Sequence, residues 1–494
     1  MNLLLLLEMA AGDRGDLAVV VADDGALTAS ELLAAAWSAA GQVGDATALA
    51  YVGTNGLAFP IGLFAAAAAG VPFVPLNYRL GDDQLHALLE PLGDTLVVAE
   101  GPVGDALGAA GHRVIDSARF VESARADPSP VGEAPGDGDE TAVLLYTSGT
   151  TAAPKAAVLR HRHLTSYVIT TVEFGGAEPD EAVLVSVPAY HVAGLANLLS
   201  NLYLGRRIVY LRQFDAAAWV AAVRREGITN AMVVPTMLAR IAEVLEADDD
   251  GLPSLRALAY GGARTPAAVL SRVMDLLPDV DLTNAYGLTE TSSTIAVLGP
   301  DDHRAARGGD PVAIARLTSA GRVLPTVELE VRGPDGEVLA EGPGEIWVRG
   351  EQVSGEYAGV AAVVDDSGWF PTRDRGWVDP DGYLFIEGRS DDTIIRGGEN
   401  IAPAEIEEVL LAHPDIEQCA VVGVPDDEWG QRVAAVVVLR PGSTPDASAI
   451  QDFARRSLRS SKTPDVIRFA DDLPYTETGK LLRRVVQADL AAPG

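Results

Sequence analysis

The sequence predicts an α/β protein, with a large N-terminal domain of helix-covered, mostly parallel sheets and a smaller α+β C-terminal domain. Three observations predict this class. Strand-like and helix-like segments alternate through the middle of the chain, short strands and Gly/Pro/Asp turns follow after about residue 310, and a second helix–strand unit begins near Arg389. Repeated β-α-β units with short connections favour a parallel sheet covered by helices on both faces.

The composition agrees with a multidomain globular protein. The chain has 494 residues, of which 48% are hydrophobic, so it can bury several cores and is not a disordered acidic tail. Its 37 basic and 70 acidic residues give a net charge of −33, which argues against nucleic acid or an anionic membrane as partner. The single cysteine, Cys419, excludes an intramolecular disulfide and fits a reducing cytoplasm.

Two apolar segments near the N-terminus need another explanation than membrane targeting. Residues 3–7 are leucines without a preceding basic segment, so a secretory signal is not expected. Residues 57–76 are uncharged and long enough to span a membrane, but they contain three prolines and two glycines. We expect a buried helix there, a turn at Gly70 and a buried strand at 71–74, and no integral membrane segment.

Local signals justify the elements of the middle region in order. Gly205 ends one helix, Asp215 caps a second that stops at Gly227, and Thr265 followed by Pro266 indicates an N-cap with proline at the first helical position. The expected strands are 182–187, 207–211, 231–234, 255–260 and 281–285, and the expected helices include 191–204, 237–245 and 266–277. Ligands of such sheets bind beyond the carboxyl ends of the strands.

The remaining elements suggest the domain boundaries. Short strands at 327–331 and 344–348, joined through a Gly-Pro-Asp-Gly turn, predict a β-subdomain at about 310–388 within an N-terminal domain of residues 1–388. Residues 389–494 then form the C-terminal domain. Its expected elements are a helix at 404–411, strands at 419–424 and 433–439, and a helix at 447–458.

Lysine is the most informative residue type, because the chain has only Lys155, Lys462 and Lys480 and every other basic residue is arginine. A position that keeps lysine in such a background favours a compact ammonium over a planar guanidinium. Lys155 closes a Thr/Ser/Gly-rich loop that follows an apolar strand, and such a loop offers backbone N–H groups and hydroxyls to phosphate oxygens. The loop is not a Walker A motif, since Gly-Lys-[Ser/Thr] is missing.

Five motifs follow one another along the chain. They are Thr147-Ser148-Gly149-Thr150-Thr151 with Pro154-Lys155, Tyr286-Gly287-Leu288-Thr289-Glu290, Thr372 with Asp374, Gly388-Arg389-Ser390-Asp391-Asp392 with Gly397-Gly398-Glu399-Asn400, and Thr478-Gly479-Lys480. In this order they resemble the adenylate-forming (AMP-binding) superfamily, and within it the acyl- and aryl-CoA synthetases. The resemblance covers nearly the whole chain.

The resemblance implies a first half-reaction in which a small-molecule carboxylic acid attacks the α-phosphate of ATP and releases pyrophosphate. Two anions must approach, so cations and aligned donors are needed. It implies Lys480, Glu290 and Thr289 as catalytic residues, with Glu290 as the Mg²⁺ ligand. The implied ATP- and AMP-binding residues are Thr147, Ser148, Gly149, Thr150, Thr151, Lys155, Gly261, Gly262, Ala263, Tyr286, Gly287, Asp374 and Arg389.

The second half-reaction implied by the resemblance transfers the acyl group to the thiol of CoA. The small, mobile C-terminal domain rotates near Asp391, withdrawing Lys480 and bringing in the loop with Gly397 and Gly398. His191 resembles an aromatic gate between the acyl pocket and the thiol channel. Trp429 is a candidate for stacking on CoA, with partial core packing as the alternative; His161 and His163 are interpreted as packing or surface residues.

The chain departs from the family pattern at a few positions. Ala152 and Ala156 stand where the phosphate loop usually has glycine, and Arg373 replaces the glycine common before Asp374. Alanine at a positive φ would be strained. Arg264 after Gly-Gly-Ala is also unusual, with the acyl group or a phosphate as candidate partners, and the role of Lys462 stays open.

Two alternatives to a CoA ligase follow from the sequence. One is a stand-alone enzyme that loads an acyl or amino acid onto a carrier-protein phosphopantetheine; the other is a nucleotide-binding pseudoenzyme. The resemblance places small residues around the acyl pocket, including Ala193, Gly194, Ala196, Ala259 and Ser292, so the slot is expected to be roomy. The residues do not choose between fatty, aromatic and dicarboxylic acids, and they leave a homodimer open.

Overall fold

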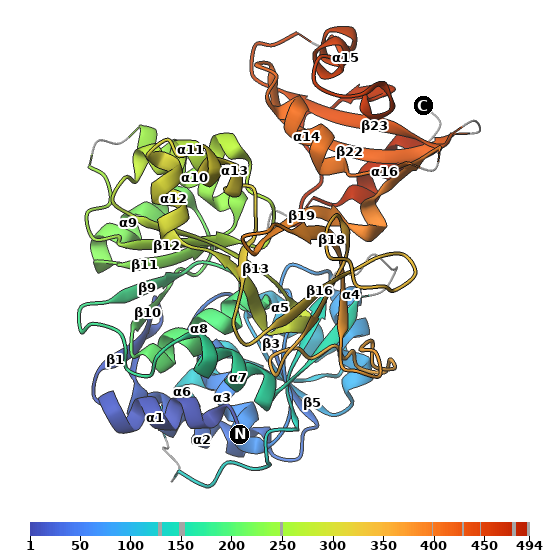
Figure 1. Ribbon diagram of the computed structural model, residues 1–494. Coiled ribbons are helices and arrows are strands. Elements are labelled where there is room, and N and C mark those ends of the chain that lie inside the picture. The colour runs from blue at the N-terminus through green and yellow to red at the C-terminus, as the bar shows by residue number, and fades with distance from the viewer. Residues whose placement is uncertain are drawn as a thin grey trace.

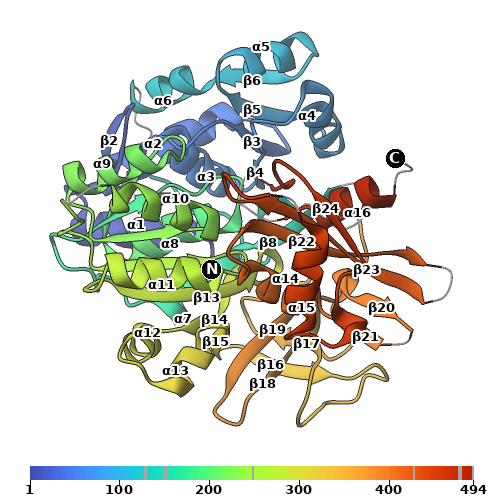
Figure 2. The ribbon, with the colours of Figure 1, turned by 90° about the horizontal axis from the view of Figure 1, so that it is seen from above.

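The computed structural model describes residues 1–126, 131–147, 154–247, 250–397, 399–426, 429–444, 446–476 and 481–491. Two large sheets and their helices form the body of the molecule, and the chain from β20 onward forms a separate lobe above it (Figure 1). Seen from above, this lobe lies over the region where β8, β13 and β19 come together (Figure 2).

The first sheet is parallel except at one edge. Among the described residues its strand order is β6-β5-β3-β4-β7-β8, and only the last pair is antiparallel. The strands are β3 (Ala48–Val52), β4 (Phe73–Pro75), β5 (Thr95–Ala99), β6 (Arg113–Asp116), β7 (Thr141–Thr147) and β8 (Lys155–Arg160). The helices around it are α2 (Ala29–Val43), α3 (Ala58–Ala69), α4 (Asp82–Leu89), α5 (Gly101–Ala109), α6 (Ser117–Ala126) and α7 (His161–Thr171).

The second sheet combines a parallel part with an antiparallel one. Its order is β16-β17-β18-β19-β15-β14-β13-β12-β11-β9-β10-β1-β2, in which β9 to β13 are parallel and β13 to β19 are antiparallel. The strands of the parallel part and its edge are β1 (Ala18–Ala22), β2 (Gly25–Thr28), β9 (Ala182–Val185), β10 (Arg207–Tyr210), β11 (Asn230–Val233), β12 (Ala257–Gly261) and β13 (Asp281–Leu288). The antiparallel strands are β14 (Ser293–Leu298), β15 (Gly321–Val323), β16 (Glu328–Arg332), β17 (Gly344–Arg349), β18 (Phe370–Val378) and β19 (Tyr383–Arg389).

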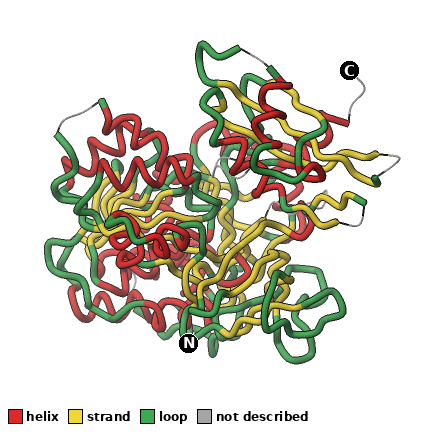
Figure 3. The backbone as a smooth tube through the Cα atoms, turned by 45° about the horizontal axis from the view of Figure 1, so that its top comes forward, coloured by secondary structure: helices red, strands yellow, loops and turns green. Residues whose placement is uncertain are grey.

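Helices cover this second sheet and join it to the first. They are α1 (Leu4–Arg14), α8 (Val192–Leu204), α9 (Ala216–Glu226), α10 (Pro235–Glu246), α11 (Ala267–Leu276), α12 (Pro300–Arg307) and α13 (Pro311–Arg316). One core cluster runs from α1 through α2 and α3 to β9 and α8, so the two sheets share a continuous apolar interior. Figure 3 shows the helices of the body lying against its strands. Each buried leucine or phenylalanine stabilises the fold by about 1.5–3 kcal/mol.

The local signals explain most element ends. Asp215 accepts a hydrogen bond from the N–H of Ala218 at 2.8 Å, and Gly205 and Gly227 end their helices in the left-handed conformation, as expected. The uncharged segment 57–76 forms α3, a turn at Gly70 and β4 inside the core, as predicted, although the strand is Phe73–Pro75 and not 71–74. No helix among the described residues is long and apolar enough to cross a bilayer.

The expected N-cap at Thr265 is wrong. Pro266 itself is the N-cap residue, with ψ 136°, and α11 begins at Ala267. The Oγ1 atom of Thr265 is buried without a hydrogen-bond partner among the described residues, so it does not cap the helix. The proline ring fixes φ near −60° in both positions, and the extended ψ is what excludes Pro266 from the first turn.

The C-terminal lobe has its own sheets and cores. The strands β22 (Ile416–Asp426), β23 (Gly430–Leu439) and β24 (Val466–Phe469) form one sheet, and β20 (Ile394–Arg396) pairs with β21 (Glu399–Ile401). The helices α14 (Pro403–Leu411), α15 (Ala447–Arg455) and α16 (Arg483–Ala491) pack on the three-stranded sheet. This α+β unit follows β19 directly; the domain boundary at residue 388 stays a prediction.

Candidate active site

The strands of both sheets end at a common region below the C-terminal lobe. Gly261 ends β12, Leu288 ends β13 and Thr147 ends β7, while Lys155 begins the antiparallel β8. Carboxyl ends of parallel strands are where open α/β sheets bind ligands. The region therefore holds the candidate site.

Tyr286, Asp374 and Arg389 meet there although they come from three strands. The hydroxyl of Tyr286 donates to Oδ2 of Asp374 at 2.6 Å, and Nη1 of Arg389 donates to Oδ1 at 3.2 Å. Asp374 is only 6% exposed, so its charge is balanced by Arg389 inside the protein. Burial, and then the charge of Asp374, raise the pKa of Tyr286, so the phenol stays protonated and donates.

Two glycines let the backbone come unusually close around Tyr286. A Cβ atom on Gly261 would lie 2.1 Å from the carbonyl oxygen of Ala285, and one on Gly287 would lie 1.8 Å from that of Ser293. Gly262 follows with φ +82°, a conformation that side chains disfavour. The slot expected from Gly261, Gly262, Ala263 and Tyr286 thus has walls of backbone that no larger residue could form.

Glu290 lies on the short 3₁₀ helix η2 (Thr289–Thr291) directly after β13. Its side chain is 8% exposed, and the hydroxyl of Tyr357 donates to its Oε1 atom at 2.5 Å. Burial, and then the charge of Glu290, raise the pKa of Tyr357. A buried carboxylate with one oxygen held by a donor keeps the other oxygen for a cation.

The residues around Glu290 fit magnesium as a partner. Mg²⁺ prefers oxygen ligands and is usually bound by one or two carboxylates together with substrate phosphates. The described residues contain no cluster of three or more His, Cys, Asp and Glu side chains that could hold a metal alone. Glu290 is therefore the candidate protein ligand of a cation whose other ligands would come from nucleotide phosphates and water.

Backbone strain is concentrated at this site. Among the described residues, the non-glycine residues with positive φ are Ser292 (56°), Ser293 (125°) and Arg373 (60°). The first two directly follow η2, and Arg373 precedes Asp374. Strained backbone of this kind persists where the surrounding structure enforces it, and it gathers at functional sites.

The phosphate loop is described only at its two ends. Thr147 pairs with Lys155 across β7 and β8, and the Nζ atom of Lys155 lies 5.8 Å from the ring centre of Tyr357. Ser148, Gly149, Thr150, Thr151 and Ala152 lie outside the described residues, as does Lys480. Ala156 is buried in β8 opposite Tyr146 and is not among the positive-φ residues, so the strain considered for it does not arise.

His191 is the residue just before α8. Its ring packs against Tyr190, with ring centres 4.6 Å apart, and burial lowers the pKa of His191 to about 4. The imidazole is therefore neutral near pH 7.

A cavity of about 320 Å³ opens beside this segment, where strand ends from both sheets face the C-terminal lobe. Pro188 and Ala189, which precede His191, line it together with three arginines. Ser186, only 2% exposed, contributes an Oγ atom without a hydrogen-bond partner among the described residues. The arginines are Arg79, Arg212 and Arg240, and Tyr475 and Thr476 close the cavity from the lobe.

The C-terminal residues expected to bind CoA lie together where they are described. The N–H of Gly397 donates to the carbonyl oxygen of Trp429 at 2.8 Å, and a Cβ atom on Gly397 would lie 3.0 Å from the indole ring. Trp429 is 46% exposed, so it is not a core residue. Gly398 lies outside the described residues, and Asp391 lies on the 3₁₀ helix η3 (Ser390–Asp392) between the body and the lobe.

Arg264 and Lys462, whose roles the sequence left open, each form an ion pair with a glutamate. Arg264 bonds Glu408 on α14 at 2.6 Å, so it faces the C-terminal lobe in this structure rather than the acyl group or a phosphate. Lys462 pairs with Glu405 at 2.5 Å within that lobe.

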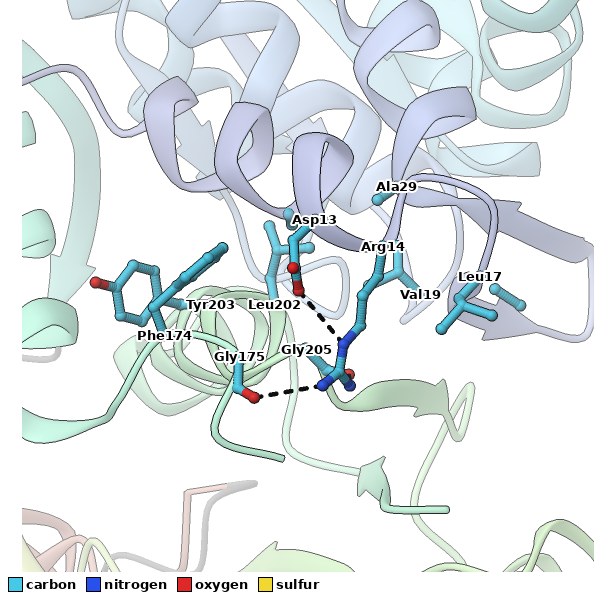
Figure 4. A pocket seen from close by; sticks show the side chains of 12 residues that line it. Asp13, Arg14, Leu17, Val19, Ala29, Phe174, Gly175, Leu202, Tyr203 and Gly205 are labelled. Atoms are coloured by element: carbon cyan, nitrogen blue, oxygen red, sulfur yellow. Dashed lines mark hydrogen bonds and ion pairs between the residues drawn. The ribbon is translucent and has the colours of Figure 1, made fainter. Parts of the chain in front are cut away.

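A second hollow is far from these residues, beneath α1 (Figure 4). It has a volume of about 20 Å³, close to that of a single water site. The guanidinium of Arg14 donates there to the carbonyl oxygens of Gly175, Ala177 and Gly205 at 3.2–3.4 Å. This is a structural contact between α1 and the loops around α8.

Sequence reasoning missed Tyr357, although it contacts two of the predicted residues. No local pattern marks it, because it lies in an irregular segment after β17. Its partners are 67 and about 200 positions away in the sequence, and only the folded chain brings them together.

The fold and the site define an α/β enzyme that binds a nucleotide and a divalent cation below a C-terminal lobe. The chain belongs to the AMP-binding enzyme family: residues 7–358 match the AMP-binding enzyme family and residues 405–480 its C-terminal domain. It is an adenylate-forming acyl- or aryl-CoA synthetase. This confirms the resemblance and the α/β fold class, and it confirms the activity, acyl-CoA synthesis through an acyl-adenylate with ATP, magnesium and CoA.

Individual relatives support the assignment. The chain is 37% identical over 449 residues to a feruloyl-CoA synthase from Amycolatopsis sp., covering 89% of this chain and 88% of the relative. It is 34% identical to a fatty acid–[acyl-carrier-protein] ligase from Streptomyces coeruleorubidus, covering 88% and 85%. The structure resembles o-succinylbenzoate CoA synthetase from Bacillus subtilis in complex with its acyl-adenylate, with a TM-score of 0.85, 27% identity and coverage of 98% and 97%.

Proposed function

We propose that this chain activates an aryl-bearing carboxylic acid and transfers it to CoA, with the residues described above in defined roles. The observation that carries the proposal is the meeting of Tyr286, Asp374 and Arg389 beside Glu290 at the strand ends. Three motifs that are far apart in sequence thereby form one polar site.

In the adenylation step, a carboxylate oxygen of the acid attacks the α-phosphorus of ATP and the bond to the β-phosphate oxygen breaks, releasing pyrophosphate. Asp374 accepts hydrogen bonds from the ribose hydroxyls, and Tyr286 lines the adenine slot. Thr147 and Lys155, with Ser148, Gly149, Thr150 and Thr151, hold the phosphates, and Thr289 donates to the α-phosphate. Glu290 would hold Mg²⁺, which would supply positive charge next to the phosphates, and Lys480 neutralises charge between the carboxylate and the α-phosphate.

In the transfer step, the thiol sulfur attacks the carbonyl carbon of the acyl-adenylate, AMP leaves, and the thiol proton passes to solvent. We assign the approach of the thiol donor to the side of His191, with Gly397, Gly398 and Trp429 brought in by rotation near Asp391. The arginine-lined cavity beside Pro188 supports this assignment, because guanidinium groups bind the phosphates that CoA carries. It also compensates locally for the net charge of −33.

The aryl substrate class is supported by relatives named for feruloyl-CoA, indoleacetate–CoA and 2-succinylbenzoate–CoA formation. Pyrophosphate release should be measured across aryl, fatty and dicarboxylic acids, with and without CoA. Faster turnover of fatty or dicarboxylic acids would contradict this class. We place the reaction in the cytoplasm, where ATP and CoA are available. Measuring the mass of the protein in solution would show whether it forms a homodimer.

A carrier protein as thiol acceptor is the second candidate, and the relative that is a fatty acid–[acyl-carrier-protein] ligase favours it. The two acceptors can be separated by supplying free CoA or a phosphopantetheinylated carrier and analysing the products. If the thioester forms only on the carrier, the carrier protein and not CoA is the thiol acceptor.

Replacing Lys480 should separate the two half-reactions. Because the ammonium is needed only while two anions approach, Lys480→Ala should lose roughly 100-fold or more in pyrophosphate release yet keep thioester formation from supplied acyl-AMP. Lys462→Ala is the matched control, since Lys462 already pairs with Glu405 inside the lobe. Equal loss in both half-reactions would contradict the rotation of the C-terminal domain.

A further inference from the structure

Residues 354–358, which we call the strap, cross from β17 toward β18 and pair with the strand that leaves the phosphate loop. The N–H of Val158 donates to the carbonyl oxygen of Glu356 at 3.0 Å, and the N–H of Ala358 donates to that of Ala156 at 2.8 Å. Ala157 and Tyr357 form an antiparallel bridge between these bonds. The strap thus extends the edge of β8 just after Lys155.

The same strap is bound to the segment that carries Glu290. The N–H of Ser354 donates to the carbonyl oxygen of Glu290 at 2.8 Å, while the Ser354 hydroxyl donates to the carbonyl oxygen of Val158. Ser354 is 6% exposed, so both bonds are shielded from water. One buried serine therefore joins η2 to β8.

Side chains reinforce both connections. Glu356 receives two hydrogen bonds from Arg160 at the far end of β8, at 2.7 and 3.4 Å. Tyr357 contacts two charged groups of the site: its hydroxyl donates to Oε1 of Glu290, and its ring centre lies 5.8 Å from Nζ of Lys155. An aromatic ring at this distance attracts the ammonium group.

We propose that Tyr357 is a positioning residue for adenylation, holding Oε1 of Glu290 so that Oε2 faces the cation and keeping Lys155 beside the phosphates. The inference rests on the proposed role of Glu290 as magnesium ligand. A carboxylate on a short helix can rotate about its terminal torsion, which is broad. A hydrogen bond from the half-buried phenol of Tyr357 removes that freedom before the cation binds, so less conformational entropy is lost on binding.

The test is the magnesium dependence of ATP binding, measured by titration calorimetry on the full-length protein. Tyr357→Phe removes the hydroxyl and keeps the ring, so the Mg²⁺ concentration for half-maximal enhancement of ATP affinity should rise roughly tenfold, as expected for loss of a hydrogen bond to a charged group. ATP binding without Mg²⁺ should change less than about twofold, because the ring still faces Lys155. Tyr383→Phe is the matched control, since it removes a tyrosine-to-carboxylate hydrogen bond, to Asp302, away from the site.

Two further variants make the outcomes distinct. Tyr357→Leu removes the ring as well, so it should also weaken ATP binding in the absence of Mg²⁺. Glu290→Gln should abolish the Mg²⁺ enhancement. If Glu290→Gln leaves the Mg²⁺ enhancement of ATP binding intact, the proposed role of Glu290 fails. If Glu290→Gln removes the enhancement but Tyr357→Phe binds Mg²⁺ like the unaltered protein, only the positioning role of Tyr357 is overturned. Equal weakening of ATP binding with and without Mg²⁺ in Tyr357→Phe would also overturn it.

Discussion

Arg373 holds the backbone in a left-handed conformation directly before the buried Asp374. The turn lets the N–H of Asp374 donate to Oγ1 of Thr372 at 3.1 Å, and the carboxylate then faces Tyr286 and Arg389. A side chain with Cβ costs on the order of 1–2 kcal/mol in this conformation. The glycine common in the family at this position would avoid that cost.

Replacing Arg373 by glycine and by alanine separates the backbone effect from the loss of charge. Both variants lose the guanidinium, but only glycine relieves the positive φ. Arg373→Gly should therefore be more stable than Arg373→Ala by about 1 kcal/mol in urea unfolding. Equal free energies of unfolding for the two variants would contradict this prediction. They would mean that residue 373 leaves the left-handed conformation once the arginine side chain is removed.

Ala156 shows the opposite case at the same scale. Alanine in place of the usual glycine suggested strain, but the residue is in an extended, paired strand whose backbone conformation does not require glycine. Sequence alone could not distinguish Ala156 from Arg373, because φ at each position is set by the partner strand.

At the scale of the element, α7 is attached through two buried histidines. Nδ1 of His161 accepts a hydrogen bond from the N–H of Leu3 at 3.2 Å, and Nδ1 of His163 accepts one from the N–H of Arg160, also at 3.2 Å. Both bonds require a neutral nitrogen as acceptor. Burial lowers the pKa of His161 to about 4 and that of His163 to about 3. The sequence left packing and surface positions open for these two histidines, and both are packing residues, with exposed fractions of 2% and 1%.

These pKa shifts predict a loss of stability in mild acid. Below about pH 6.5 the unfolded chain binds protons at these histidines while the folded chain does not, so their contribution is complete above pH 6.5 and falls as the pH decreases toward 4. The loss is on the order of 1.4 kcal/mol per pH unit for each histidine. Urea unfolding between pH 7 and 4.5 measures it.

His163→Asn is the informative variant for this slope. Asparagine keeps an acceptor for the N–H of Arg160 and does not titrate, so the dependence of unfolding free energy on pH should become shallower than in the unaltered protein. An unchanged slope would show that other groups cause the acid sensitivity.

Local sequence patterns did not predict which sheet each strand joins. Caps and turns located the helices, as Asp215 and Gly227 show, because each acts on its own neighbours. Which sheet a strand joins depends on distant partners: β1 near the N-terminus pairs with β10, and β15 pairs with β19.

At the scale of the whole molecule, one ion pair connects the nucleotide-site loop to the C-terminal lobe. Arg264 follows the glycines of the adenine slot, and Glu408 lies on α14. Both side chains are about half exposed, so the pair is worth up to about 1 kcal/mol. That is enough to shift the balance between two lobe orientations about fivefold.

Breaking this pair should affect one half-reaction more than the other. We assign the lobe orientation seen here to adenylation, because Tyr475, five positions before Lys480, lines the cavity at the strand ends. Arg264→Ala and Glu408→Ala each remove the ion pair of this orientation, so each should slow adenylation about two- to fivefold. Thioester formation from supplied acyl-AMP should not slow. The charge-exchanged double variant, Arg264→Glu with Glu408→Arg, should recover adenylation; no recovery would contradict a role for the pair in lobe orientation.

The amino-acid sequence by itself determined the family and the fold class and predicted the residues of the site, because caps, periodicity and motifs such as Tyr286 to Glu290 lie within a few neighbouring positions. Only the tertiary structure decided which of these groups meet. Tyr357 reaches Glu290 across 67 positions, and Arg264 reaches Glu408 across 144. Such contacts carry no local signal, since they arise when whole strands and helices pack against one another.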